Sequence, residues 1–200
     1  VTDVAHLPLG YAPVLERIVH GEKDIDVVFY GSVNPRRVEI IRAMERMGLN
    51  VAWTNQGAWT REERDSYIAR AKVVLNLGFF EQVHILEEVR LAYLLCNRVA
   101  VVSEIRPDTF AEDDLIQCVA GAALADLPDL CASMCASTGR RLDLAERGYE
   151  TFRKREWLGA LGRAVDDYAE RNPGRSRAIK RDVDPPARIN IGSGRNWRFD

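Results

Sequence analysis

The stretch Asp26-Val-Val-Phe-Tyr-Gly-Ser-Val-Asn-Pro-Arg-Arg37 decides the fold class. Its first five residues form a short, largely apolar run of the kind found in buried strands, and Gly31 ends it. Apolar residues at helical spacing then predict a helix over Pro35–Met47, which Gly48 stops. A buried strand that leads through a tight turn into a helix is the opening unit of a parallel sheet covered by helices.

The same alternation continues outward from this unit. Further strands are predicted at Leu49–Trp53, Val73–Leu77 and Val99–Ser103. Helices are predicted between them, one over residues 60–71 that opens with the capping-box sequence Thr60-Arg-Glu-Glu63, and one over His84–Cys96. Strands that alternate with helices predict an α/β fold with a Rossmann-like, doubly wound parallel sheet.

The region that follows is less regular. It contains a weak fifth strand at Leu115–Val119, a short helix at Asp126–Ser137 and a long C-terminal helix over Asp143–Arg171, either continuous or broken near Gly159 or Gly162. We therefore expect four parts: a lead-in or interdomain segment (1–23), the Rossmann-like domain (24–171), a linker rich in Pro, Gly and charge (172–187) and the start of another domain (188–200).

The composition excludes several classes of protein. The 200 residues are 46% hydrophobic and 29% charged, which is a globular balance. Twenty-eight basic and 30 acidic residues give a net charge of −2, so no global basic field attracts nucleic acid. No apolar run approaches the roughly 18 residues that span a bilayer. The four cysteines lack metal-site spacing, so we expect no metal site, reduced buried or half-buried thiols and a cytoplasmic location.

The first candidate site is the turn Gly31–Arg37, because ligands of open α/β sheets bind outside the carboxyl ends of the strands. Gly31 lets the backbone approach a ligand, and Asn34 is suited to cap the helix. Arg36 and Arg37 stand in the first helical turn, where a cation is unfavourable unless an anion is bound. The turn predicts an anion site, with a solvated arginine pair as the alternative.

The second candidate site follows the third strand. Asn76 lies in an otherwise apolar strand, and Glu87, Glu88 and Arg90 lie in the helix after it. A carboxylate there could accept hydrogen bonds from ribose hydroxyls, and His84 at the predicted helix start could contact a phosphate. The alternative is a solvated charged face with an i,i+3 pair between Glu87 and Arg90.

The ordered set of these segments resembles the C-terminal half of GT-B glycosyltransferases, in the branch of the group 1 and spore-maturation CgeB-like proteins. The resemblance covers about residues 5–170, and the segments that carry it are Leu7–Pro13, Asp26–Ser32 with Arg36 and Arg37, Ala71–Leu77, Glu87–Arg90 and Val101–Glu104. In that family two Rossmann-like lobes face each other across a cleft. The C-terminal lobe holds the sugar nucleotide, and the N-terminal lobe supplies most of the acceptor site.

The resemblance implies roles for the candidate residues. It places the donor diphosphate at Gly31, Ser32, Asn34, Arg36 and Arg37, and the donor sugar or ribose at Asn76, His84, Glu87, Glu88 and Arg90. Tyr93 stands where many retaining members have the second glutamate of an acidic pair, so the stereochemical course stays open, and no catalytic residue is assigned. The resemblance implies a sugar-nucleotide substrate, no tightly bound cofactor, and an acceptor held by another lobe, so we expect residues 1–200 alone to be inactive.

The tail carries a second resemblance, because Arg188-Ile-Asn-Ile-Gly-Ser-Gly194 is similar to the first motif of class I methyltransferases that bind S-adenosylmethionine. We expect it to be the first part of a fused domain that does not bind cofactor here. Two alternatives to the transferase lobe stay open. One is a non-catalytic Rossmann-like module that binds a phosphate or nucleotide or serves interaction. The other is a flavodoxin-like or receiver-like domain, although Phe29-Tyr-Gly31 replaces the acidic cluster of receivers. A homodimer through an exposed apolar cleft face is a further expectation.

Overall fold

A computed structural model describes residues 7–54, 59–111 and 113–171 of the chain. It contains a five-stranded sheet in which every pair of neighbouring strands is parallel. The α/β class and the helix-covered parallel sheet are thus confirmed. The strands are β1 (Ile25–Phe29), β2 (Val51–Trp53), β3 (Ala71–Asn76), β4 (Val101–Glu104) and β5 (Ala120–Ala122).

The strands lie in the order β2-β1-β3-β4-β5. The chain steps from β1 to one side to form β2 and then crosses to the other side to form β3, so Val27 pairs with both Val51 and Val73. This is one of the two common doubly wound orders, the one also found in flavodoxin-like sheets. The order changes direction between β1 and β3, and the crevice outside their carboxyl ends is where open α/β sheets bind ligands.

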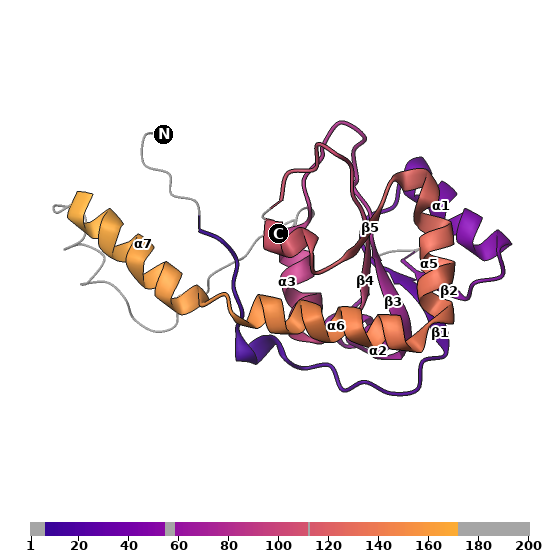
Figure 1. Cartoon of the computed structure of the whole chain (residues 1–200), viewed down its shortest axis with the longest axis horizontal. Coiled ribbons are helices and arrows are strands. Elements are labelled where there is room, and N and C mark those ends of the chain that lie inside the picture. The colour runs from indigo at the N-terminus through magenta and orange to yellow at the C-terminus, as the bar shows by residue number, and fades with distance from the viewer. Residues whose placement is uncertain (1–6, 55–58, 112, 172–200) are drawn as a thin grey trace, which may run out of the picture. The chain divides into compact units, whose positions relative to one another are not determined.

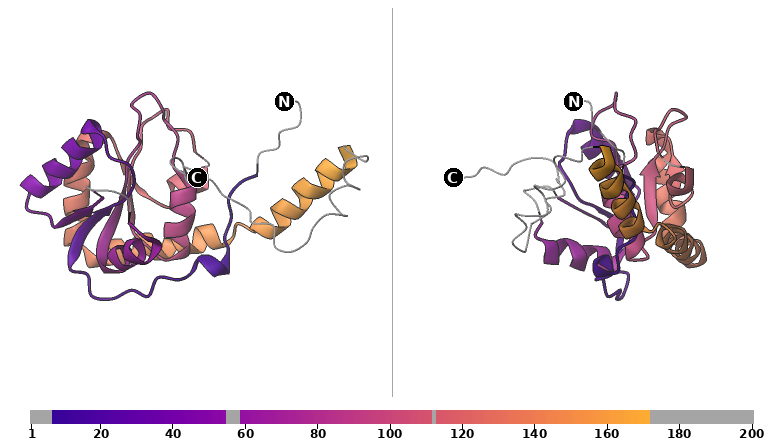
Figure 2. Two further views of the ribbon diagram at one scale, coloured as in Figure 1. Left: turned by 180° about the vertical axis from the view of Figure 1, so that it is seen from behind. Right: turned by 90° about the vertical axis from the view of Figure 1, so that its left-hand side faces the viewer.

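Helices cover both faces of the sheet (Figures 1 and 2). Helices α1 (Pro35–Arg46) and α5 (Leu127–Ala136) pack on the face that carries Val27 and Val73, and α2 (Arg61–Arg70) and α3 (Glu88–Cys96) pack on the face that carries Val28 and Val74. Successive strand residues point to opposite faces, so each of β1 to β4 contributes to both apolar layers. The four cysteines are all buried free thiols, as the sequence predicts.

The expected helix starts at α1 and α2 are confirmed in detail. The Asn34 side chain accepts a hydrogen bond from the backbone N–H of Arg37 (2.9 Å), and Pro35 occupies the first helical position. At α2 the Thr60 and Glu63 side chains each accept a hydrogen bond from the other residue's backbone N–H, which completes the capping box. These local contacts fix where both helices begin.

The predicted fifth strand at Leu115–Val119 is wrong. Leu115 lies instead in the short helix α4 (Asp113–Ile116), with 1% of its surface exposed, and β5 forms from Ala120, Gly121 and Ala122. A Cβ atom at Gly121 would lie 2.6 Å from Ile105 Cγ1, so this strand requires a residue without a side chain. Ala120, Gly121 and Ala122 are not residues that predict a strand, so the sequence pattern did not reveal β5.

The C-terminal region forms two helices, α6 (Thr138–Arg153) and α7 (Trp157–Arg171), so the break lies at residues 154–156 and not near Gly159 or Gly162. The backbone N–H of Tyr11 donates to the Arg155 carbonyl (2.9 Å), and this pairing with the N-terminal segment replaces helical hydrogen bonds. The main compact unit is Pro8–Leu158, which includes most of the predicted lead-in. The predicted linker (172–187) and methyltransferase-like motif (188–200) lie outside the described residues.

Most of α7 belongs to a second unit, in which Arg171 Nε donates to the Asp167 carbonyl (3.1 Å). Short 3-10 turns at Pro13–Leu15 and Leu124–Asp126 complete the regular elements of the described chain. Among these elements, none joins enough length to enough apolar character to cross a bilayer.

Candidate functional site

The candidate site lies at the carboxyl ends of β1, β3 and β4. Two long loops, one after β3 and one after β4, rise over this edge of the sheet (Figure 1). They pair with each other, because the Phe110 N–H donates to the His84 carbonyl (2.7 Å) and the Leu86 N–H donates to the Phe110 carbonyl (3.1 Å). The loops and the turn after β1 therefore form one connected edge above the point where the strand order changes direction.

Arg37 is the buried centre of this edge, with 3% of its side chain exposed. Its guanidinium donates to the carbonyls of Ser32 (2.7 Å), Leu77 and Gly78 (3.3 Å) and to the carboxylate of Glu87 (3.1 Å). Burial lowers the pKa of Arg37 to about 10, which leaves the side chain charged at neutral pH. Arg37 thus joins the turn after β1 to the loop after β3 and points inward.

Arg36 is held by Glu104 at the end of β4. Its guanidinium forms a two-pronged ion pair with the Glu104 carboxylate and also donates to the Gly78 carbonyl (3.0 Å). Arg106 Nε donates to the same carboxylate (3.1 Å). Burial acts to raise the pKa of Glu104, but hydrogen bonds from Arg36 and the charges of both arginines lower it below its ordinary value. Glu104 is therefore an ionised bridge between two arginines.

Glu87 forms a second bridge of the same kind. Its carboxylate accepts a hydrogen bond from Arg37 (3.1 Å) and forms an ion pair with Arg90 (2.9 Å), so the i,i+3 pair of the alternative interpretation is present. Arg90 also donates to Asn76 Oδ1 (3.1 Å), and the Asn76 amide donates to the Ser103 hydroxyl (3.0 Å). Glu87 has 36% of its side chain exposed, whereas Arg90 has 12%. Glu87 is thus the member of this pair that solvent reaches most easily.

The two bridges make one charged network around the crevice. Four arginines share two glutamates within it, so positive charge exceeds negative charge among the side chains that contact each other directly. These side chains nearly fill the space between the loops. The remaining cavity has a volume of ≈ 20 Å³, which suits a single water molecule. A larger ligand therefore requires the loops and their ion pairs to rearrange.

The prediction that His84 starts a helix is wrong, because α3 begins at Glu88 and His84 lies in the paired loop. Its ring Nδ1 pairs with Asp108, which lies across the loops, and the hydrogen bond to His84 lowers the pKa of that carboxyl. The ring Nε2 lies 2.6 Å from Arg106 Nη1. His84 thus contacts the network through Arg106 and also lines the small cavity, so it fastens the loops and faces the crevice.

Gly31 and Ser32, two of the predicted site residues, leave the turn after β1 accessible. Gly31 has φ 135°, a conformation that L side chains rarely adopt, and a Cβ atom there would lie 2.9 Å from Arg90 Nη2. Ser32 and Val33 follow it with exposed side chains, and within the described residues their backbone amides donate to no protein acceptor. The turn therefore offers N–H groups toward solvent.

The structure brings together nearly all of the predicted site residues. Asn34 joins them through its side-chain N–H, which donates to the Phe79 carbonyl (2.7 Å), whereas Glu88 is half-exposed and makes no contact with the network in the described part of the chain. Sequence reasoning assigned no role to Ser103, Glu104 or Arg106. The signal in the sequence is the polar end of β4, where Ser103 and Glu104 follow two valines, with Arg106 two residues further on.

Comparison with known proteins gives one partial relative. An uncharacterized protein of Acanthamoeba polyphaga mimivirus is 34% identical over 82 residues, which cover 41% of this chain and 9% of the viral protein. No protein-family model matches the chain. The chain thus spans a small part of the length of this relative, and the match assigns no activity to the chain.

Proposed function

We propose that this lobe binds a nucleoside-diphosphate sugar outside the carboxyl ends of β1 and β3, as the donor-binding part of a glycosyltransferase. The observation that carries the proposal is the pair of shared carboxylates, in which Glu87 bridges two arginines and Glu104 bridges two more. Four guanidinium groups with two counter-charges attract a polyanion. Their position at the change of strand direction is where doubly wound sheets hold nucleotides.

Exchange of ion-pair partners is the step by which the ligand enters. A diphosphate oxygen replaces the Glu87 carboxylate on Arg90, since Glu87 is the more exposed partner of that pair. The amides of Ser32 and Val33 donate to the same diphosphate, and the missing side chain at Gly31 leaves room for its approach. The released Glu87 carboxylate then accepts hydrogen bonds from the ribose hydroxyls, which is the role that the family resemblance implies for it.

The chemistry of such a lobe is electrostatic. Arginines and backbone N–H groups stabilise the departing nucleoside diphosphate while an acceptor hydroxyl attacks the anomeric carbon of the sugar. In this proposal the acceptor site and any general base come from a second lobe. We therefore expect residues 1–200 alone to bind the donor without transferring sugar, and turnover of a panel of sugar nucleotides by this chain would contradict that expectation.

Calorimetric titration with UDP, GDP, their sugars and pyrophosphate tests the proposal. We expect saturable nucleotide binding that Arg90→Gln weakens at least about tenfold, because a charge-assisted hydrogen bond is lost. Arg46→Gln, at an exposed arginine of α1, is the matched control and should leave the affinity unchanged. Glu87→Gln should weaken binding of the nucleotides but not of pyrophosphate, whereas Glu88→Gln should change neither.

A non-catalytic phosphate-binding or interaction module is the second candidate. It is favoured by the internal pairing of Arg36 and Arg37, which already satisfies these side chains without a ligand. If no nucleotide binds, or if pyrophosphate binds as tightly as every nucleotide, this second function replaces the first.

A further inference from the structure

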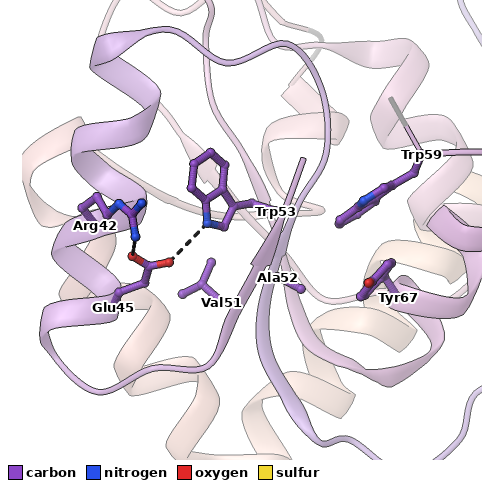
Figure 3. A pocket seen from close by; sticks show the side chains of 7 residues that line it. All are labelled: Arg42, Glu45, Val51, Ala52, Trp53, Trp59 and Tyr67. Carbon is purple, nitrogen blue, oxygen red and sulfur yellow. Dashed lines mark hydrogen bonds and ion pairs between the residues drawn. The ribbon is translucent and has the colours of Figure 1, made fainter. Parts of the chain in front are cut away.

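The outer edge of β2 carries a feature that the candidate site does not use. A pocket of ≈ 410 Å³ lies along this edge, which is one end of the sheet. Figure 3 shows the strand running through the middle of the pocket, with side chains on both of its faces. The lining residues are Arg42 and Glu45 from α1, Val51, Ala52 and Trp53 from β2, and Trp59 and Tyr67 on the other face.

Within the part of the chain that the structure describes, the backbone of β2 has hydrogen-bonding groups at this edge that no other protein group uses. The Asn50 carbonyl accepts from the Val27 N–H (3.2 Å), and the Thr54 N–H donates to the Phe29 carbonyl (3.3 Å). Successive residues of a strand direct their N–H and C=O groups to opposite sides. The backbone groups of Asn50, Ala52 and Thr54 therefore point toward β1. Val51 and Trp53 therefore direct their N–H and C=O groups away from the sheet.

These outward groups have the spacing that an antiparallel strand needs. Two residues that exchange both of their hydrogen bonds form one antiparallel pair, and such pairs recur at every second residue. A second β2 turned about a two-fold axis at Ala52 places Val51 opposite Trp53 of the other copy, and Trp53 opposite Val51. Each of these is a β-branched residue facing an aromatic residue, which is a stabilising cross-strand combination.

The charges beside the strand have the same symmetry. Arg42 lies toward the Trp53 end of β2, with its guanidinium carbon 5.5 Å from a Trp53 ring centre, and Glu45 lies toward the Val51 end (Figure 3). Glu45 accepts hydrogen bonds from Arg42 (2.6 Å) and from the Trp53 indole N–H (3.2 Å). The two-fold axis at Ala52 that pairs Val51 with Trp53 also turns the Glu45 side of each copy toward the Arg42 side of the other.

We propose that β2 pairs antiparallel with β2 of a second copy of this chain, so that the two sheets continue into each other. The edge fits itself in backbone register, in side-chain pairs and in charge, which identifies a second copy as its occupant. On the other face, the stacked rings of Trp59 and Tyr67 (centroids 4.3 Å apart) flank the same edge. This interface lies apart from the charged network and does not depend on the proposed ligand.

Sedimentation velocity of the full chain over a wide concentration range tests the pairing. We expect a reversible monomer–dimer equilibrium, and a monomer at every concentration would overturn the proposal. Arg42→Glu and Glu45→Arg each place like charges opposite one another, and each should weaken self-association at least about tenfold. An equimolar mixture of the two variants should dimerise again, because opposite charges then face each other. A mixture that stays monomeric while the wild type dimerises contradicts this interface.

A backbone variant tests the strand pairing separately. Val51 directs its N–H away from β1, so Val51→Pro removes an outward donor and leaves the sheet's own ladder intact. We expect Val51→Pro to abolish the dimer with an unchanged circular dichroism spectrum, and Val51→Ala, which keeps the N–H, to dimerise. If Val51→Pro misfolds, the charge-exchange mixture decides the matter.

Discussion

Near the amino-terminal end of the sheet the neutral side chain of Asn97 joins the N-terminal segment to α3, whereas at the carboxyl end four arginines and two glutamates join the loops. The ion pairs Lys72–Asp26 and Arg70–Asp24 also lie at the amino-terminal end, where β1 and β3 begin. Asn97, at the end of α3, accepts hydrogen bonds from the amides of Arg17 (2.8 Å) and Ile18 (2.9 Å). Its own amide donates to the carbonyls of Leu15 (2.7 Å) and Tyr93 (2.8 Å). Each end thus fastens loops that are distant in sequence, but with different chemistry.

The difference between Asn97 and the charged network shows which of them can respond to its surroundings. The hydrogen bonds of Asn97 join neutral groups that are all satisfied within the protein, so an ion has nothing to displace. The ion pairs at the carboxyl end can exchange a carboxylate for another anion, and they change with pH. The Asn97 contact is therefore suited to a structural role and the charged network to binding.

The largest effect should come from removing the centre of the charged network. Arg37→Ala leaves Glu87 and three carbonyls without their shared donor, so we expect it to lower the free energy of unfolding by about 3–5 kcal/mol. Urea denaturation measures this loss. Arg46→Ala, at an exposed position of the same helix, should stay within about 0.5 kcal/mol of the wild type. Equal effects at both positions would mean that the network does not hold the loops.

A smaller loss of stability is expected at Asn97. Asn97→Ala leaves two N–H groups and two carbonyls without partners, and we expect a loss of about 2–3 kcal/mol. Hydrogen exchange should show reduced protection of the Arg17 and Ile18 amides. Asn50→Ala, at an exposed asparagine with one side-chain donor bond, serves as control and should cost less than about 1 kcal/mol. Unchanged protection in Asn97→Ala would show that the N-terminal segment is held by other contacts.

The smallest expected effect is on the pH dependence of the free energy of unfolding. The lowered pKa of Glu104 means that its stabilising contribution is complete above the ordinary glutamate value of 4.5 and is lost as pH falls through the lower folded-state value. The acid decline of the unfolding free energy should therefore be shallower in Glu104→Gln than in the wild type. The curve of Asn97→Ala should run parallel to that of the wild type, because Asn97 does not titrate, and a changed slope there would contradict its purely neutral role.

Local patterns in the sequence were enough to predict much of the fold. β1, β3 and β4 are short apolar runs because both faces of the sheet are covered, and the caps at Asn34 and Thr60 depend only on residues three positions away. The start of α3 could not be predicted in this way. Ile85 and Leu86 mimic the apolar spacing of a helix, but that segment pairs with Phe110, which comes from a distant part of the chain.

The candidate site was predictable in its place but not in its contacts. The turn Gly31–Arg37 lies at the carboxyl end of the first strand whatever the rest of the chain does, so connectivity alone located it. The partner of Arg36, however, is Glu104, 68 residues further along the chain. Such a pair forms only when the sheet brings both strand ends together, and no spacing in the sequence predicts it. The sequence therefore marked the arginines without showing that they are already paired.

The four buried cysteines also allow local opening of the protein to be measured without an introduced label. Burial raises the pKa of Cys131 to about 12 and that of Cys135 to about 11, so neither forms a reactive thiolate while the protein is closed. Cys96 and Cys118 lie in one apolar layer, and Cys131 and Cys135 lie in the other. The rate at which a thiol reagent modifies each pair, resolved by mass spectrometry, therefore reports how often each side of the sheet opens, without any label being introduced.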